Sequence, residues 1–154
     1  MIAILQRVTQ ADVKISGECV GEIGRGILVL LGVARGDTEN DAALLADKIS
    51  KLRIFSDGDG KMNLSVTDVS GGILVVPNFT LLASCRKGNR PDFFGSAPPD
   101  TAKQLFETFC SLIEERIGTV GRGVFGADMK VSLVNDGPVT ITLDTDDLKR
   151  SRRS

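Results

Sequence analysis

The sequence of 154 residues contains no histidine. This absence excludes a Ser-His-Asp or Cys-His catalytic arrangement, an imidazole general base and a histidine-ligated zinc site. The three cysteines, Cys19, Cys85 and Cys110, are far apart in sequence and form no CxxC pair, so we expect no bound metal or cofactor. An enzyme of this composition must use carboxylates, hydroxyls, backbone groups or the substrate itself.

Long apolar runs are also missing. No window of 18 apolar residues occurs, so no helix is expected to cross a membrane. The first residues lack a basic segment followed by a cleavable apolar stretch, so no signal peptide is expected. An odd number of separated cysteines is typical of reduced thiols. These features predict a soluble, cytoplasmic protein.

Length and composition predict one compact domain. A hydrophobic content of 42% is enough for a core, and the apolar pattern continues to Leu143, so residues 1–143 are expected to form the domain. Residues 144–154 hold acidic and then basic residues with almost no apolar side chain, which predicts a charged, mobile C-terminal tail.

Positive charge is local rather than general. The net charge of −1 argues against a surface that attracts polyanions everywhere. Three cations, Arg86, Lys87 and Arg90, nevertheless gather in one loop. This loop is either solvated and without function, or a patch that holds a few phosphates.

Hydrophobic periodicity indicates the fold class. Apolar and polar residues alternate in about eight or nine short segments, and two longer segments have apolar residues at helical spacing. The helices are expected to begin at Asp37 or Thr38 and at Pro98 to Asp100. The predicted class is α/β of the α+β type: a mainly antiparallel, curved sheet or small β-barrel covered by two helices.

Two short sequence motifs occur without the structural context or ligand residues that their usual function needs. Gly121 to Gly126 matches GxGxxG, but it follows a helix and precedes strands, so dinucleotide binding is not expected. Asp57 and Asp59 resemble the start of a calcium loop. Lys61 and Met62 stand where that loop needs a ligand and a glycine.

Two segments combine apolar runs with proline. In Val131 to Leu143, alternating residues flank Asn135-Asp136-Gly137-Pro138, which predicts either a hairpin that tolerates proline or a rigid turn whose free carbonyls recognise a ligand. In Ile73 to Ala83, the run is interrupted at Pro77-Asn78-Phe79-Thr80. This is either a strand end at a sheet edge or part of a site built from backbone groups, which would be blind to side-chain identity.

Several stretches share order and spacing with one known family. They are the opening MIAILQRVTQADVKISGECVGEIGRGILVLLGV, then RIFSDGDGKMNLSV, ILVVPNFTLLA and ADMKVSLVNDGPVT. From Met1 to about Leu143, the sequence resembles the D-aminoacyl-tRNA deacylase family. The resemblance implies a homodimeric hydrolase with active sites at the subunit interface. It would cleave the ester of D-aminoacyl-tRNA, and of glycine mischarged on tRNA-Ala, as a proofreading step.

The resemblance also implies a site. In the family a Gly-cisPro pair from one subunit enters the pocket of the other and excludes the side chain of an L-amino acid, and Gly137-Pro138 match this pair. The opposite wall is Ser-Gln-Phe-Thr in the family and Pro77-Asn78-Phe79-Thr80 here. Backbone amides near Phe79 and Thr80 would stabilise the oxyanion, Thr80 would orient rather than attack, and the ribose 2′-hydroxyl would assist. Other matched positions near the pocket are Arg7, Phe125 and Met129.

The wall departs from the family pattern at Pro77 and Asn78. Deacylases that clear L-alanine from tRNA also begin this segment with proline, followed by Gln-Ala-Thr, and hold their Gly-Pro pair in trans. The retained Phe79 favours the D-specific reading. A relaxed-chirality deacylase acting on L-alanyl-tRNA and a non-catalytic tRNA-binding dimer are the alternatives. In each case the candidates for acceptor-stem phosphate contacts are Arg86, Lys87 and Arg90.

Overall fold

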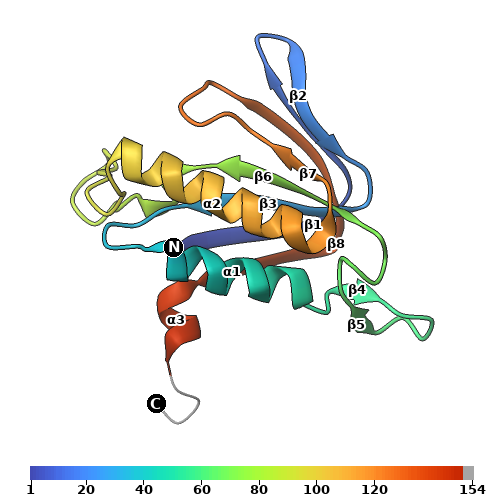
Figure 1. Ribbon diagram of the computed structural model, residues 1–154. Coiled ribbons are helices and arrows are strands. Elements are labelled where there is room, and N and C mark those ends of the chain that lie inside the picture. Colours follow the sequence, from blue (N-terminus) through green and yellow to red (C-terminus); the bar gives the residue numbers. More distant parts are fainter. Residues whose placement is uncertain (151–154) are drawn as a thin grey trace.

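The computed structural model describes residues 1–150 and shows a curved mixed sheet with helices on one side (Figure 1). The main sheet has six strands in the order β2-β1-β3-β6-β7, with β8 paired to the other edge of β1. The strands are β1 (Ile2–Ile15), β2 (Glu18–Ile23), β3 (Gly26–Gly32), β6 (Gly72–Pro77), β7 (Val120–Arg122) and β8 (Lys130–Asp144). A separate two-stranded sheet contains β4 (Phe55–Ser56) and β5 (Met62–Leu64).

Strand β1 organises the sheet because it pairs with three strands. One edge pairs with β3 over its first half and with β2 over its second half, and the other edge pairs with β8 over nearly its whole length. All of these pairs are antiparallel, whereas β3, β6 and β7 are parallel neighbours. The sheet curls until β2 approaches β7: a Cβ added at Gly21 would lie 3.0 Å from the carbonyl oxygen of Arg122. The prediction of a curved sheet or small β-barrel is confirmed, and the sheet is mixed and nearly closed.

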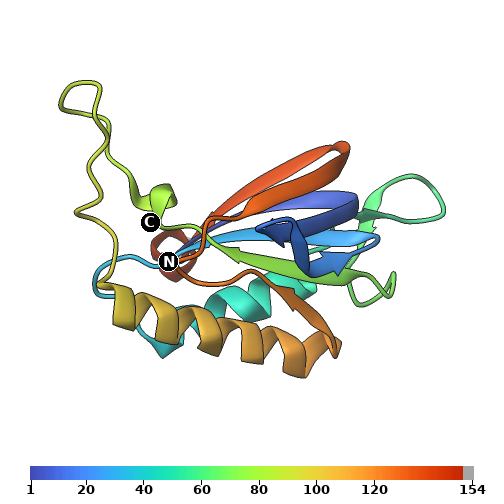
Figure 2. The same cartoon turned by 90° about the horizontal axis from the view of Figure 1, so that it is seen from above.

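Two long helices, α1 (Glu39–Lys51) and α2 (Pro99–Ile117), cover one face of this sheet (Figure 2). Their buried residues meet the apolar side of β1, β3 and β6, and the largest fully buried side chains include Phe55, Phe106 and Phe109. Burial of each such side chain stabilises the fold by roughly 1.5–3 kcal/mol. No helix in residues 1–150 has both the length and the apolar character to span a membrane.

The segment around Gly137-Pro138 is not a hairpin. Both of its halves belong to β8 and pair with β1 rather than with each other. Between the pairs Gln6–Thr140 and Val8–Asn135, β1 contributes one residue, Arg7, and β8 contributes four. The extra residues form a loop, here called the Gly137 loop (residues 136–139), that bulges out of an otherwise continuous strand. The alternation of apolar residues indicated strand on both sides but carried no information on their partner.

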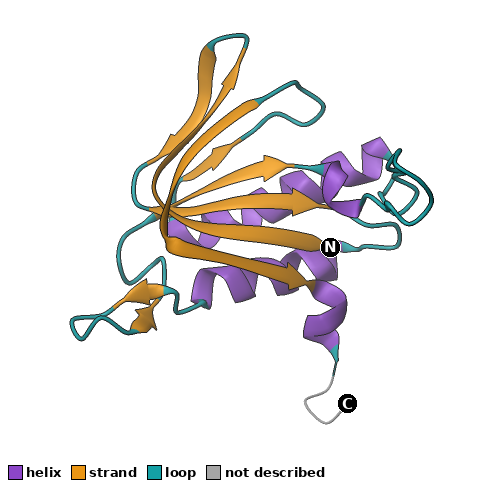
Figure 3. Ribbon diagram, turned by 180° about the vertical axis from the view of Figure 1, so that it is seen from behind, coloured by secondary structure: helices purple, strands orange, loops and turns teal. Residues whose placement is uncertain are grey.

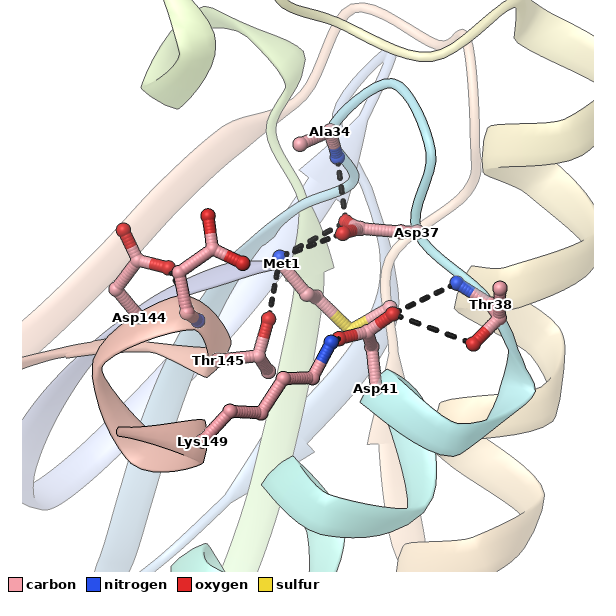
Figure 4. A network of polar contacts seen from close by, with 9 residues as sticks. Met1, Ala34, Asp37, Thr38, Asp41, Asp144, Thr145 and Lys149 are labelled. Atoms are coloured by element: carbon pink, nitrogen blue, oxygen red, sulfur yellow. Dashed lines mark hydrogen bonds and ion pairs between the residues drawn. The ribbon is translucent and has the colours of Figure 1, made fainter. Parts of the chain in front are cut away.

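The chain after Asp144 differs from the expected tail. Thr145–Lys149 form a short helix, α3, because Thr145 is buried and its amide donates to the carbonyl oxygen of Met1, 2.9 Å away. Lys149 forms an ion pair with the buried carboxylate of Asp41 in α1 (Figure 4). Polar contacts anchor this segment where apolar residues are few. The rest of the expected tail, residues 151–154, lies outside the described residues.

Candidate active site

A groove opens where β6 ends. Its volume is about 460 Å³, and the whole segment from Pro77 to Thr80 lines it together with Met129. The amide of Asn78 donates to the carbonyl oxygen of Leu31 at 2.8 Å, so the chain stays tied to β3 for one residue past the strand. It then turns into the 3-10 helix η1 (Phe79–Leu82). We call this cavity the Pro77 groove.

Two neighbouring backbone amides point to the chemistry of the Pro77 groove. Phe79 and Thr80 begin η1, and within residues 1–150 their N–H groups donate no hydrogen bond. Free N–H groups at the start of a helical turn are donors available to an anion. Both residues are exposed, so a ligand in the groove can reach these donors. This is the arrangement that an oxyanion requires.

Within residues 1–150, the groove has no buried side chain that could act as a general base. The hydroxyl of Thr80 donates to the side-chain oxygen of Asn78. Among the described residues that line the groove, the only ionisable one is Asp128, whose side chain is 90% exposed and pairs with Lys130 at 3.4 Å. The groove therefore has donors for a developing charge but no side chain prepared to remove a proton.

Met129 and Phe125 have different environments. Met129 lines the groove, and its sulfur lies 3.4 Å from the amide nitrogen of Val124. Gly123 lies between the sulfur and Pro77: an added Cβ there would be 2.8 Å from the sulfur and 3.1 Å from Pro77 Cδ. Phe125 packs against the main core and does not line the groove. The structure thus brings one of these two predicted residues into the groove of its own chain.

The side chains of Arg7 and Asn135 hold the Gly137 loop in place. Arg7 is buried, and it donates to the carbonyl oxygens of Asp136 at 3.0 Å and Ile54 at 2.7 Å. The amide group of Asn135 closes the loop, because it donates to the carbonyl oxygen of Val139 at 3.0 Å and accepts from the Val139 amide at 3.1 Å. The Gly137-Pro138 peptide bond is cis, and both residues are exposed. Arg7 braces this loop and does not line the Pro77 groove.

The Pro77 groove and the Gly137 loop are apart in one chain. The groove begins beside Leu31, which pairs with Ala3, whereas the loop lies beside Arg7, which pairs with Ile27. Four residues along a strand correspond to about 13 Å. Neither Gly137 nor Pro138 lines the groove. The groove and the loop are therefore separate features of one chain.

The basic loop protrudes beside η1 (Figure 2). A two-residue antiparallel bridge, from Ser84 to Asp92 at 2.9 and 3.0 Å, closes its base. The side chains of Arg86, Lys87 and Arg90 are all exposed beyond that bridge. No ion pair to these three cations is present within residues 1–150. Their charge is available to a phosphate ligand.

Sequence reasoning missed two residues of this region. Phe93 meets Phe79 edge to face, with ring centroids 5.0 Å apart, and Asn135 locks the Gly137 loop. Phe93 lies two residues after Pro91 in an irregular segment, where no periodicity predicts which way its side chain points. Asn135 was recognised as turn chemistry, but the partners of its amide group depend on the bulge in β8.

Comparison with known proteins decides the family. Residues 4–144 match the family described as D-Tyr-tRNA(Tyr) deacylase. The chain belongs to this deacylase family. Two proteins named D-aminoacyl-tRNA deacylase, from Geobacter sulfurreducens and Anaeromyxobacter dehalogenans, are 59% and 57% identical to it. Each alignment covers 94% of this chain, and 95% and 97% of those relatives respectively.

Solved structures of similar proteins agree with the deacylase fold. One, titled c-Myc DNA Unwinding Element Binding Protein, is 42% identical, has a TM-score of 0.88, and is matched over 94% of this chain and 98% of its own. Another is titled a probable eukaryotic D-amino acid tRNA deacylase. It is 18% identical over 92% of this chain and 97% of its own, with a TM-score of 0.79. At that identity the second match supports the fold alone.

Proposed function

We propose that the protein is a homodimeric, cytoplasmic hydrolase that cleaves the ester of D-aminoacyl-tRNA in the Pro77 groove. D-aminoacyl-tRNA deacylase activity follows from the family and from relatives that carry this name over nearly their full length. The observation that carries the mechanism is the pair of free amides at Phe79 and Thr80 in a groove without a buried base. The same groove would accept glycyl-tRNA mischarged on tRNA-Ala.

The chemistry proposed for the groove is direct attack by water. Water adds to the ester carbonyl carbon, and the developing oxyanion accepts hydrogen bonds from the amides of Phe79 and Thr80. The bond from that carbon to the ribose oxygen then breaks, and the proton lost by water ends on the departing ribose hydroxyl. The neighbouring 2′-hydroxyl of the ribose is in position to relay this proton. An aminoacyl ester is labile, so positioning and charge stabilisation replace a strong base.

Chiral selection is assigned to the Gly137 loop of the partner subunit. The loop is exposed, braced from below and absent from the groove of its own chain. In a two-fold dimer it would face the groove of the other subunit, and its carbonyls would occupy the space that the side chain of an L-amino acid needs. A ten-thousandfold preference requires about 5.5 kcal/mol. A rigid steric and electrostatic clash supplies energies of that order.

Two other functions compete with this proposal. Pro77 and Asn78 replace the Ser-Gln of the family wall, which favours a permissive pocket that also hydrolyses L-alanyl-tRNA. A dimer that binds tRNA without cleaving it would use the same basic loop.

The first test measures release of amino acid from matched D-aminoacyl-, L-aminoacyl- and glycyl-tRNA by purified protein, without added metal or nucleotide. We expect cleavage of the D and glycyl esters, with the L ester spared. Cleavage of L-alanyl-tRNA would replace the D-specific assignment with the permissive one. If none of the three esters is cleaved, a dimer that binds tRNA without hydrolysing it is the better interpretation.

A further inference from the structure

The exposed aromatic rings of this protein are concentrated at one place. The chain has seven phenylalanines and neither tryptophan nor tyrosine. In the described residues, three of these rings are largely exposed: Phe79 (53%), Phe93 (38%) and Phe94 (78%). Phe79 lines the Pro77 groove and contacts Phe93 edge to face, and Phe93 and Phe94 directly follow Asp92 at the base of the basic loop. Exposed rings beside free cations are the combination that single-stranded nucleic acid binds.

The backbone under Phe94 is fixed, although its ring is in solvent. The carbonyl oxygen of Phe94 accepts from the Arg35 guanidinium, and its amide donates to the Asp92 carboxylate at 3.3 Å. The next residue, Gly95, accepts from the Arg35 amide at 2.9 Å. The backbone of Phe94 is therefore fixed while its side chain stays in solvent, where a base can reach the ring, and the Arg35 guanidinium is bound to the carbonyl oxygen of the same residue.

We propose that Phe94 is a stacking platform for a base of the single-stranded 3′ end of tRNA, next to the terminal nucleotide whose ester lies in the Pro77 groove. This inference rests on the proposed function, because it takes the groove as the place of the ester. Leading outward from the groove, the strand would pass the rings of Phe93 and Phe94 and then reach Arg86, Lys87 and Arg90. Stacking supplies affinity there without selecting a sequence, which suits an end shared by all tRNAs.

The test compares Phe94→Ala with Phe94→Trp on three substrates of increasing length: D-aminoacyl-adenosine, a D-aminoacyl trinucleotide ending in CCA, and full-length D-aminoacyl-tRNA. We expect Phe94→Ala to raise KM about five- to fiftyfold for the trinucleotide and the tRNA. D-aminoacyl-adenosine has no neighbouring base, so its kcat/KM is expected to stay unchanged. Phe94→Trp keeps an aromatic face and should restore the KM of the longer substrates.

Charge reversal in the basic loop provides the matched contrast. Lys87→Glu with Arg90→Glu should weaken the salt dependence of KM for full-length tRNA, whereas Phe94→Ala should leave the slope against salt unchanged because no ion pair is lost. An unchanged KM in Phe94→Ala for every substrate would overturn the inference. An equal loss on D-aminoacyl-adenosine, or a change of dimer mass in light scattering, would assign Phe94 a structural role instead. Failure of the unaltered protein to cleave any D ester would refute the proposed function itself.

Discussion

At the scale of single residues, the side chains and the backbone amides of the Pro77 groove have different roles. Thr80 is a hydroxyl residue in a hydrolytic groove, yet its hydroxyl is engaged by Asn78 and no base stands beside it. The amides of Phe79 and Thr80 remain free within the described chain. A nucleophilic hydroxyl needs an adjacent base or a lowered pKa. The residue-level evidence therefore assigns the main catalytic effect to the amides.

Removal of an amide should cost more activity than removal of a side chain. Thr80→Ala loses one orienting hydrogen bond and should retain activity, with kcat reduced by about five- to thirtyfold. Phe79→Pro deletes one oxyanion donor and should lower kcat by about 10²–10³-fold relative to Phe79→Ala, which loses the same ring but keeps the amide. Asn78 has φ −147° and ψ 89°, outside the helical region that a following proline disfavours.

These rates are measured as single-turnover hydrolysis of D-aminoacyl-tRNA, with circular dichroism to verify folding. Thr80→Ser, which keeps the hydroxyl, is the control for the side chain. A folded Thr80→Ala protein with no activity at all would contradict the backbone mechanism.

At the scale of elements, polar contacts join the two ends of the domain. The α-ammonium group of Met1 pairs with Asp37 at 2.9 Å and donates to the hydroxyl oxygen of Thr145 at 2.8 Å (Figure 4). Asp41 caps α1 by accepting from the amide of Thr38 at 2.8 Å, and it also pairs with Lys149 of α3. Helix α3, which is too short to be stable alone, is thus fixed against α1 and the start of β1.

The ion pair of Asp41 and Lys149 should contribute measurable, acid-sensitive stability. Burial would raise the pKa of Asp41, but hydrogen bonds from Lys149, Thr38 and Thr145 outweigh this and lower its pKa from 3.8 to about 2. Lys149→Ala should reduce the free energy of unfolding at pH 7 by a modest amount, since Lys149 is half exposed and solvent screens the pair. Lys51→Ala removes an ion pair with Asp47 in which neither partner is buried, and it should change the free energy of unfolding by less than about 0.5 kcal/mol.

The pH dependence follows from the direction of this shift. A carboxyl whose folded-state pKa is depressed stabilises the fold above about pH 4 and loses that contribution as the pH falls towards 2. The difference between Lys149→Ala and the unaltered protein should therefore shrink over this range in urea unfolding curves. A constant difference from pH 7 to pH 2 would show that the contribution of Lys149 is not electrostatic.

At the scale of the whole molecule, the curled sheet separates the two halves of the proposed site. The bend in β8 at the Gly137 loop lies at the same end of the sheet as the C-terminal end of α2, whereas η1 lies at the opposite end (Figure 3). A rigid sheet cannot bring these ends together, because its strands are hydrogen-bonded along their length. The proposed catalytic unit is therefore a dimer, in which each groove receives the loop of the other subunit.

Mixed dimers test this arrangement. Phe79→Pro disables a groove, and Gly137→Ala displaces a loop, because Gly137 has φ +138° and an added Cβ would lie 2.9 Å from the Val139 amide nitrogen. A dimer of one chain of each kind has one groove and one loop intact, in the same site if the site is shared. We expect such dimers, isolated through two different affinity tags, to cleave the D ester at about half of the unaltered rate and to spare the L ester, because the working groove faces an intact loop. Cleavage of the L ester, as in the Gly137→Ala homodimer, would place each loop and groove in one chain.

Much of the fold was predictable because it depends on local pattern. Two-residue alternation marked the strands of the sheet, and helical spacing with Thr38 and Pro98 marked the starts of α1 and α2. The partner of β8 was not predictable, because pairing joins residues more than a hundred positions apart, such as Ala3 with Leu143. The position of α3 was not predictable for the same reason, because contacts with the distant residues Met1 and Asp41 fix it.

The sequence by itself determined the family, the absence of histidine chemistry and the two proline-containing segments, since composition and residue order are properties of the chain alone. Tertiary structure decided that Arg7 and Asn135 brace the Gly137 loop, that the amides of Phe79 and Thr80 stay free, and that loop and groove lie apart in one chain. Those facts depend on which backbone N–H and C=O groups form hydrogen bonds between strands and which remain without a partner. That is a property of the folded sheet, to which distant residues contribute equally.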